Sequence, residues 1–276
     1  MFSPDQYELV DFGDGEKLER FMGDLLIRRP APVTESMPRL DSPEWDIAVS
    51  YDREAGWNIP ASAIESLVQH RGICFKLAGT PTGQVGLFPE QVANWDWILD
   101  SKLDLTGLKA INLFGYTGGT TMALALRGAE VTHVDAAQPV VKWARENAQE
   151  AGLGEAPIRW IAEDAIRFLE REIKRGNRYD IVVADPPSFG RGPKKEVWKI
   201  QRDLPRLIQL LDKLCGQQCK LAILSCHTAD YSSADLGTMM RSQFRLKQHV
   251  GQLLNLGLPC PPARTLPSGS CFRFEI

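Results

Sequence analysis

The sequence predicts an α/β fold, in which a doubly wound, mostly parallel sheet of seven strands follows a small β-rich N-terminal domain. From residue 109 onward, nearly continuous apolar runs alternate with amphipathic stretches, a pattern typical of a parallel sheet covered by helices on both faces. Before about residue 89 the apolar runs are short and are broken by Gly, Pro and Asp, which indicates short strands. We therefore predict two domains, over residues 1–88 and 89–276.

The N-terminal region supplies only short elements. Brief apolar runs predict strands within residues 7–13, 17–28, 46–51 and 72–79. The segment at residues 28–43, RRPAPVTESMPRLDSP, holds four prolines and predicts a loop. Residues 88–103, FPEQVANWDWILDSKL, predict a turn and a short helix that lead into the second domain.

The second region alternates strands with helices. The predicted strands lie at residues 109–114, 130–135, 158–162, 179–185 and 221–226. The predicted helices lie at residues 120–128, 139–152, 164–176, 196–214 and 233–244. Two last segments, 246–257 and 268–276, predict an antiparallel hairpin at one edge of the sheet.

Composition and cysteine spacing indicate a soluble cytoplasmic protein without a metal site. Hydrophobic residues make up 43% and charged residues 24% of the chain, which are ordinary values for a globular protein. The six cysteines form no C-x-x-C pair, and Cys215-x-x-x-Cys219 lacks a second ligand pair, so free thiols in a reducing compartment are expected. The N-terminus has no signal-peptide pattern, and no apolar run reaches the roughly 18 residues that span a bilayer.

Charge is divided unevenly along the chain, whose net charge is −3. Residues 1–106 carry 9 Lys and Arg against 18 Asp and Glu, whereas residues 107–276 carry 23 against 17. This asymmetry is consistent with a second domain that tolerates a polyanion, and equally with ordinary solvated surfaces.

A glycine-rich turn and a later carboxylate predict a nucleoside site. Gly115, Gly118 and Gly119 follow the first strand of the second domain, where they let the backbone approach a ligand. Asp135 ends the next strand, where a carboxylate can accept hydrogen bonds from ribose hydroxyls. The G-x-x-G-G spacing differs from the dinucleotide fingerprint G-x-G-x-x-G, which favours a nucleoside without a pyrophosphate over NAD.

Two later motifs lie at the same predicted sheet edge. Asp164 follows the third strand and precedes a helix, where it can receive an adenine amino group or cap the helix. The run Asp185-Pro-Pro-Ser-Phe189 ends the fourth strand, because two prolines cannot continue a ladder. An acid, a rigid turn and an aromatic ring together suit a planar, hydrogen-bonding group such as a flipped base.

The ordered set G-Y-T-G-G, V-D, E-D-A and D-P-P-x-F resembles the class I S-adenosylmethionine-dependent methyltransferases, whose fold is Rossmann-like. It is most similar to the bacterial group that includes large-subunit rRNA cytosine-C5 and guanine methyltransferases. The resemblance covers about residues 85–276, and GLFPEQVANWDWILD matches the lead-in segment of that group. It implies transfer of a methyl group from S-adenosylmethionine to a base in RNA, with rRNA favoured.

The resemblance also implies roles for individual residues. Asp135 takes the ribose and Asp164 the adenine edge, and Gln91 reaches the cofactor from the lead-in segment. The methyl acceptor faces Asp185, Pro186 and Phe189. The complete cofactor-binding set that it implies is Gln91, Phe114, Gly115, Tyr116, Thr117, Gly118, Asp135, Ala136, Asp164 and Asp185.

Two acceptor chemistries remain open. Methylation of a cytosine C5 needs a thiolate to add at C6, and Cys226 stands where the C5 enzymes have their nucleophile. His227 replaces the serine of their S-C-S run, however, and a small buried residue at a strand end is a common role for cysteine, which the sequence slightly favours over catalysis. Methylation of an amino or ring nitrogen needs no nucleophile, only steering by Asp185 and the Pro186 carbonyl, but Ser188 separates the aromatic residue from the prolines.

The acceptor itself is less specifically predicted than the cofactor. Arg191, Lys194, Lys195, Lys199 and Arg202 could contact phosphates, with Trp198 available for stacking, or they could form a solvated surface. The alternatives are a protein or small-molecule acceptor, an NAD-dependent oxidoreductase, and a non-catalytic binding module. The oligomeric state is left open.

Overall fold

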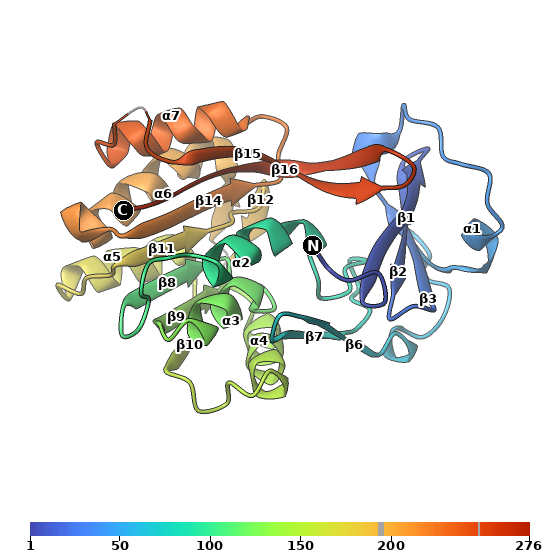
Figure 1. The fold of residues 1–276 in the computed structure, drawn as a ribbon, viewed down its shortest axis with the longest axis horizontal. Coiled ribbons are helices and arrows are strands. Elements are labelled where there is room, and N and C mark those ends of the chain that lie inside the picture. Colours follow the sequence, from blue (N-terminus) through green and yellow to red (C-terminus); the bar gives the residue numbers. More distant parts are fainter. Residues whose placement is uncertain (193–195, 248) are drawn as a thin grey trace. The chain divides into compact units, whose positions relative to one another are not determined.

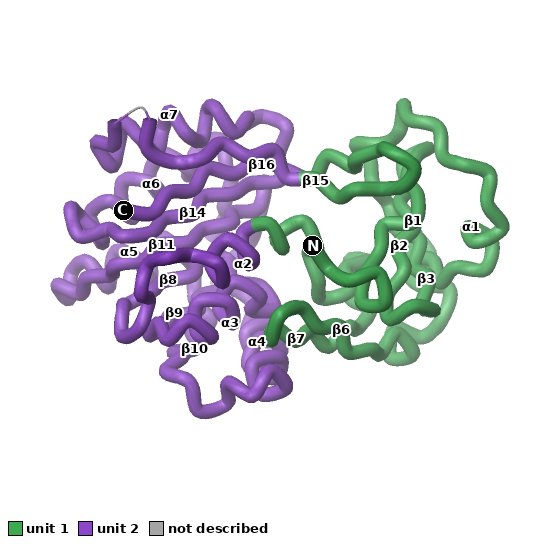
Figure 2. The backbone as a smooth tube through the Cα atoms, in the orientation of Figure 1, with its two compact units in different colours: residues 1–93, 257–268 green, residues 94–256, 269–276 purple. Residues whose placement is uncertain are grey.

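The computed structural model describes residues 1–192, 196–247 and 249–276, and it divides them into two compact units (Figure 2). The larger unit comprises Asn94–Leu256 and Gly269–Ile276, and the smaller comprises Met1–Ala93 and Gly257–Ser268. Each unit is described by itself below.

The larger unit is built on a seven-stranded sheet in the order β10-β9-β8-β11-β14-β16-β15 (Figure 1). The first five strands in this order pair in parallel, and β16 pairs antiparallel with β14. The predicted doubly wound, mostly parallel sheet with a hairpin at its edge is therefore confirmed. The strands are β8 (Lys109–Leu113), β9 (Glu130–Asp135), β10 (Ile158–Ala162), β11 (Ile181–Ala184), β14 (Leu221–Cys226), β15 (Gln252–Cys260) and β16 (Arg264–Glu275).

Helices cover both faces of this sheet (Figure 1). α5, α6 and α7 pack on one another along one face, where alternate strand residues such as Ile111, Leu113 and Leu224 are fully buried. α3 and α4 pack against β8, β9 and β10. The helices are α2 (Val92–Leu99), α3 (Gly119–Leu126), α4 (Gln138–Glu150), α5 (Ala165–Lys174), α6 (Ile200–Cys215) and α7 (Ser233–Gln243), with η4 (Gly216–Gln218) after α6.

One predicted helix begins later than expected. Residues 196–214 were expected to be helical, but β13 (Val197–Lys199) pairs antiparallel with β12 (Phe189–Arg191), and α6 begins at Ile200. The cause is Trp198, whose ring lies 5.0 Å from that of Phe114 and whose Nε1–H donates to the Pro187 carbonyl at 2.6 Å. These contacts hold the segment extended against the turn after β11.

The smaller unit contains a five-stranded sheet and a separate hairpin. The sheet order is β1-β2-β3-β4-β5, and β6 pairs with β7. The strands are β1 (Tyr7–Gly13), β2 (Glu16–Phe21), β3 (Leu25–Pro30), β4 (Val49–Asp52), β5 (Gly56–Trp57), β6 (Ser66–His70) and β7 (Ile73–Leu77). The short helices are η1 (Pro32–Thr34), α1 (Glu44–Ile47), η2 (Ala61–Ala63) and η3 (Pro89–Gln91).

The proline-rich segment starts later than predicted, because Arg28 to Pro30 belong to β3. The Arg29 guanidinium lies inside the unit and pairs with the fully buried Glu19 carboxylate. Tyr7 Oη and Lys17 Nζ also donate to Glu19, each at 3.0 Å. These partners lower the pKa of Glu19 to about 2, against a burial effect that acts in the opposite direction.

The tip of the β15–β16 hairpin belongs to the smaller unit, where Arg264 binds Asp11. Arg264 Nη1 donates to Asp11 Oδ1 at 2.7 Å, Nη2 donates to the Phe12 carbonyl, and the guanidinium lies 4.1 Å from the Phe12 ring centroid. Asp11 is buried, with 2% of its surface exposed. Its other oxygen accepts from the Leu40 amide and from Trp45 Nε1.

We expect Arg264→Ala to lower the free energy of unfolding by about 2–3 kcal/mol, because it removes the charged partner of a buried carboxylate that keeps two neutral donors. Urea unfolding of the full chain measures the change. Arg264→Lys should recover only part of it, since an ammonium cannot reproduce the guanidinium fork. Arg53→Ala, at an exposed position, is the control. Equal stability of Arg264→Ala and the control would contradict the assignment.

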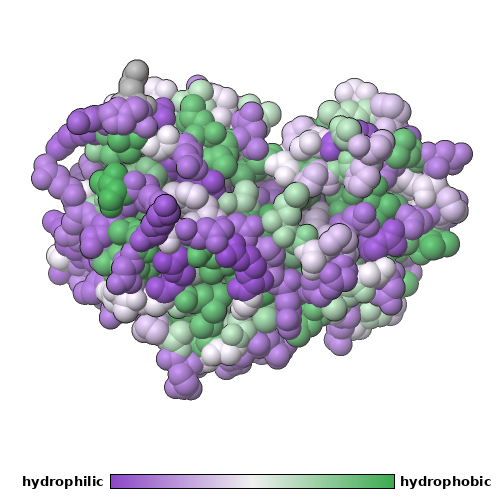
Figure 3. Space-filling view, in the orientation of Figure 1, coloured by the Kyte–Doolittle hydropathy of each residue, from purple (hydrophilic) through white to green (hydrophobic). Residues whose placement is uncertain are grey.

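Polar side chains are prominent on the surface. On the face drawn in Figure 3, hydrophobic side chains are interspersed with hydrophilic ones. Among the described residues, no helix is both long enough and apolar enough to pass through a bilayer.

Candidate active site

The predicted site residues of the larger unit follow the carboxyl ends of its central parallel strands. β8 lies between β9 and β11. The chain first adds β9 and β10 on one side of β8 and then adds β11 and β14 on its other side. Ligands bind at such a switch point, outside the carboxyl ends of the strands. The turn after β8, the end of β9, and the segments after β10, β11 and β14 all lie at this edge.

The turn after β8 has an unusual backbone. Phe114 and Tyr116 have φ values of 56° and 48°, and Gly118 has 93°, so three alternate residues adopt the left-handed region. The turn is closed by bonds from the Gly115 amide to the Val134 carbonyl and from the Gly118 amide to the Gly115 carbonyl, both at 3.0 Å. Non-glycine residues in this region are strained, and such strain is concentrated at ligand sites.

Packing beneath the turn explains why residue 115 must be glycine. A Cβ on Gly115 would come within 2.6 Å of the His133 ring and 3.1 Å of the Asn112 amide, whatever ligand lay above. Asn112 Nδ2 donates to Thr121 Oγ1, which lies 2.9 Å from His133 Nδ1. Burial lowers the pKa of His133 to about 3, so the ring is neutral. Sequence reasoning assigned the glycine to a ligand and missed this polar layer.

Asp135 connects the turn to β9. Its Oδ2 accepts from the Tyr116 amide and its Oδ1 from the Ala137 amide, each at 3.0 Å, so its carboxylate is fixed relative to the turn. Burial raises its pKa above the ordinary aspartate value, although these amides oppose the shift. Ala136 follows it directly, and Thr117 is held by a bond from Asn147 Nδ2 to its carbonyl at 2.9 Å.

Asp164 caps α5, the simpler of its two predicted roles. Its Oδ1 accepts from the Arg167 amide at 3.0 Å, in the ordinary geometry of a helix N-cap. A carboxylate has a second oxygen, so the cap is compatible with a bond to an adenine amino group. Gln91, by contrast, is buried in η3 and belongs to the smaller unit.

Asp185 follows β11 and interacts with two side chains from β14 and the residue after it. Ser225 Oγ donates to Asp185 Oδ1 at 2.7 Å, and His227 Nε2 lies 3.2 Å from Oδ2. Pro186 is buried. Phe189 is 53% exposed and therefore available to a ligand at this edge. The sequence predicted Asp185 but not its partners Ser225 and His227. Their spacing of two residues at a strand end, which places both side chains on the same side, was the available signal.

Cys226, unlike its neighbours Ser225 and His227, is part of the hydrophobic core. It is fully buried and belongs to the hydrophobic cluster on the α5–α7 face, together with Ala222 and Leu224. Burial raises the pKa of its thiol, and the charge of Asp185 adds to this effect. A thiolate nucleophile needs the opposite shift.

The predicted basic segment is only partly described, because Lys194 and Lys195 lie outside the described residues. Arg191 and Lys199 belong to β12 and β13, and both are exposed. Arg202 pairs with Asp203 at 2.7 Å. The prediction that Trp198 is available for stacking is wrong, because the indole is 5% exposed and packs on Phe114.

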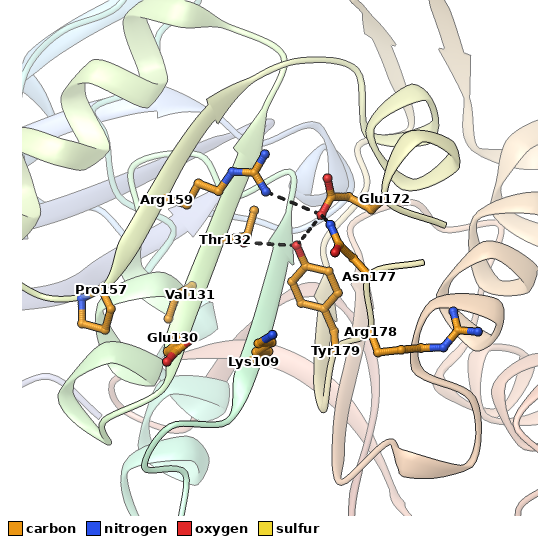
Figure 4. A pocket seen from close by; sticks show the side chains of 10 residues that line it. All are labelled: Lys109, Glu130, Val131, Thr132, Pro157, Arg159, Glu172, Asn177, Arg178 and Tyr179. Atoms are coloured by element: carbon orange, nitrogen blue, oxygen red, sulfur yellow. Dashed lines mark hydrogen bonds and ion pairs between the residues drawn. The ribbon is translucent and has the colours of Figure 1, made fainter. Parts of the chain in front are cut away.

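A cavity of about 250 Å³ opens at the opposite, amino edge of the sheet (Figure 4). Glu172 accepts from Asn177 Nδ2 at 2.7 Å and from Tyr179 Oη at 3.0 Å, and Arg159 lies 3.5 Å from the same carboxylate. The buried Glu172 and Tyr179 are thus paired with each other and with the exposed Asn177 and Arg159, and none of the predicted site residues lines the cavity. We interpret it as part of the structural support of α5.

The carboxyl edge fits the cofactor that the motifs predict. The carboxylates of Asp135, Asp164 and Asp185 lie at this edge, and carboxylates can accept hydrogen bonds from hydroxyl and amino groups and stabilise a nearby positive charge. The turn at residues 114–118 contains no Lys or Arg that would favour a pyrophosphate. Within the described residues, no group of three or more His, Cys, Asp and Glu is arranged to hold a metal ion.

A family model described as S-adenosylmethionine-dependent methyltransferase matches residues 55–230. The ribosomal RNA large subunit methyltransferase K/L of Shewanella frigidimarina is 29% identical over 176 residues, covering 62% of this chain and 24% of that protein. The ribosomal RNA large subunit methyltransferase K of Neisseria meningitidis is 34% identical over 110 residues, covering 39% and 31%. The chain thus spans less than a third of the length of each of these two relatives.

Solved structures extend the similarity to nearly the whole chain. The crystal structure of the SAM-dependent methyltransferase from Agrobacterium tumefaciens has a TM-score of 0.86 and 33% identity, covering 98% of this chain and 90% of that one. A methyltransferase complexed with SAH has a TM-score of 0.72 and 19% identity, covering 97% and 76%, which shows similarity of fold alone.

Proposed function

The chain belongs to the family of S-adenosylmethionine-dependent methyltransferases, and on that premise we propose that it methylates a base in ribosomal RNA in the cytoplasm. Its cofactor is S-adenosylmethionine, as the motifs predicted, and the alternative of an NAD-dependent oxidoreductase is set aside. We further propose that residues 89–276 carry cofactor binding and methyl transfer, and that residues 1–88 form most of a β-rich domain, to which the hairpin tip at residues 257–268 also belongs.

S-adenosylmethionine supplies an electrophilic methyl group on a sulfonium when it is bound. In our proposal, Asp135 accepts hydrogen bonds from the ribose and Asp164 from the adenine amino group. The strained turn, through Phe114, Gly115 and Gly118, lines the methionine portion, and Tyr116, Thr117 and Ala136 complete the cofactor-binding set together with Gln91, whose role is implied by the resemblance alone. Their fixed geometry matters, because catalysis by positioning requires the reacting groups to be held before reaction.

The observation that supports the acceptor proposal is that a carboxylate fixed by two neighbouring side chains lies close in sequence to an exposed aromatic ring. Asp185 is fixed by Ser225 and His227, and Phe189 is exposed nearby in sequence. An acceptor that gains positive charge during methyl transfer is stabilised by a nearby carboxylate. In our proposal Phe189 stacks on the base, and Asp185 with the Pro186 carbonyl orients its nitrogen.

Ribosomal RNA is favoured as the acceptor by the names of the relatives, which are ribosomal RNA methyltransferases. The exposed Arg191 and Lys199, close in sequence to Phe189, suit a phosphate backbone. A protein or small-molecule acceptor would use the same cofactor site without these cations, and it remains the alternative.

We propose nitrogen methylation over the C5 mechanism, in which Cys226 would be catalytic. We expect Cys226→Ala to keep kcat within about threefold, because the thiol is buried on the α5–α7 face and its raised pKa disfavours a thiolate. Single-turnover transfer of labelled methyl groups to ribosomal RNA measures this, with Cys215→Ala as a matched buried-cysteine control. Loss of activity in Cys226→Ala alone would instead establish the covalent mechanism.

A mass-spectrometric nucleoside profile of ribosomal RNA from a deletion strain and its parent tests the substrate. Loss of one methylated nucleoside, restored by the purified full chain in vitro, is the expected result. A purine product would agree with nitrogen methylation, and 5-methylcytidine would favour the role of Cys226. Identical profiles would contradict the proposed acceptor.

A further inference from the structure

We propose that Ser225 and His227 are positioning residues for Asp185, and that His227 makes methyl transfer depend on pH near neutrality. This inference rests on the proposed function and extends it, because the motifs that predict the site assign no role to Ser225 or His227. It starts from the contacts at the carboxyl ends of β11 and β14.

The register of these two strands brings the three side chains together. β11 and β14 are parallel neighbours, with Ala184 opposite Leu224, so the next pair along the strands is Asp185 and Ser225. Alternate residues of an extended segment point to the same side. Ser225 and His227 accordingly both reach Asp185, at 2.7 and 3.2 Å, whereas Cys226 between them is buried in the core on the α5–α7 face.

β16 leaves space for the imidazole. Gly269 lies beside the end of β14 with a φ of 134°, and a Cβ there would stand 2.6 Å from the Cys226 carbonyl and 3.2 Å from His227 Nδ1. A larger residue would therefore displace either the strand end or the ring. The glycine, the serine and the histidine together define one orientation of the Asp185 carboxylate.

The tautomer follows from the chemistry of the pair. An ionised carboxylate can only accept hydrogen bonds, so neutral His227 donates Nε2–H to Asp185. Protonation of the ring would place a positive charge 3.2 Å from Asp185 and offset the negative charge that stabilises the acceptor as it gains positive charge. Activity should therefore rise with pH as the imidazole loses its proton.

Histidine is the side-chain type whose ordinary titration range spans neutrality, and His227 is the histidine that contacts Asp185. Among the described residues, the other titratable side chains that interact with one another at this strand end include Asp185 after β11, Asp230, Tyr231 and Asp235 after β14, Cys226 on β14, and Cys271 and Arg273 on β16. Carboxylates ordinarily titrate well below this range, and thiols and phenols above it. Burial raises the pKa values of both cysteines and of Tyr231 still further.

The test compares His227→Gln, His227→Ala and Ser225→Ala in the full chain, with His249→Gln as an exposed histidine control. We expect kcat of the wild type and of the control to rise several-fold between pH 5.5 and 7.5. His227→Gln should lose this dependence but keep kcat at pH 7.5 within about fivefold, because its amide still donates. His227→Ala and Ser225→Ala should lose at least tenfold, with S-adenosylmethionine affinity retained by calorimetry.

Three results would contradict the inference. A His227→Gln variant that is as inactive as His227→Ala would make His227 a proton acceptor rather than a positioning residue. An unchanged pH profile in both variants would overturn the inference. Nitrogen-15 spectra of the imidazole provide a readout that needs no acceptor: an Nδ1–H tautomer at pH 8 overturns the inference, even if transfer to ribosomal RNA is never observed.

Discussion

Replacing Asp135 with alanine is expected to weaken S-adenosylmethionine binding at least about a hundredfold, since the two hydrogen bonds that we propose between the ribose and this charged acceptor would be lost, at about 1.5–3 kcal/mol each. The structure adds a second reason. The carboxylate also accepts from the Tyr116 and Ala137 amides, so the strained turn loses one of the groups that fix it. Calorimetric titration of the variant with the cofactor measures the loss.

Two controls separate ligand contact from collapse of the turn. Asp135→Asn retains one carbonyl acceptor and should bind with intermediate affinity, while Glu130→Ala, at the exposed start of the same strand, should bind normally. Because burial raises the pKa of Asp135 and the ribose hydroxyls favour its ionised form, affinity should fall as pH is lowered toward that pKa. Wild-type affinity in Asp135→Ala would contradict the assignment.

Replacing Asp185 with alanine is expected to lower kcat by about 10² to 10³, the range found when one group that stabilises a transition-state charge is removed. The loss should appear mainly in kcat, with cofactor affinity reduced by about tenfold at most. Asp185→Asn keeps the shape and a carbonyl acceptor for Ser225 Oγ, but it carries no charge. It should therefore remain nearly as impaired as Asp185→Ala.

Rapid-quench transfer of a labelled methyl group, at saturating cofactor and RNA, isolates this step from binding. Asp203→Ala is a suitable control, because this carboxylate lies in the first turn of α6 and pairs with Arg202. If Asp185→Asn were fully active, the negative charge of Asp185 would not contribute to catalysis, and the side chain would serve only to orient the acceptor.

The larger unit was predictable because each of its central strands carries its own signal. Runs such as Ile181–Ala184 are apolar throughout, as expected of strands buried on both faces, and Asp135 and Asp185 stand directly at strand ends. The resemblance to methyltransferases, the cofactor and the sheet were all confirmed. The roles of the individual site residues remain predictions.

What could not be predicted depends on partners distant in sequence. The extended conformation of Val197–Lys199 arises from contacts of Trp198 with Phe114 and Pro187, which no local pattern reveals. The pairing of Asp185 with Ser225 and His227 likewise requires the register of β11 and β14, 40 residues apart. The glycine at 115 was interpreted through a ligand because His133 beneath it was not foreseen.

Because of the β15–β16 hairpin, neither structural unit is one continuous stretch of the sequence. Residues 257–268 complete the smaller unit, while 252–256 and 269–276 remain with the larger one. A stop codon after residue 256 would therefore delete β16 from the catalytic sheet and remove Arg264 from Asp11 at the same time. Neither unit can therefore be transplanted as one uninterrupted segment of this chain.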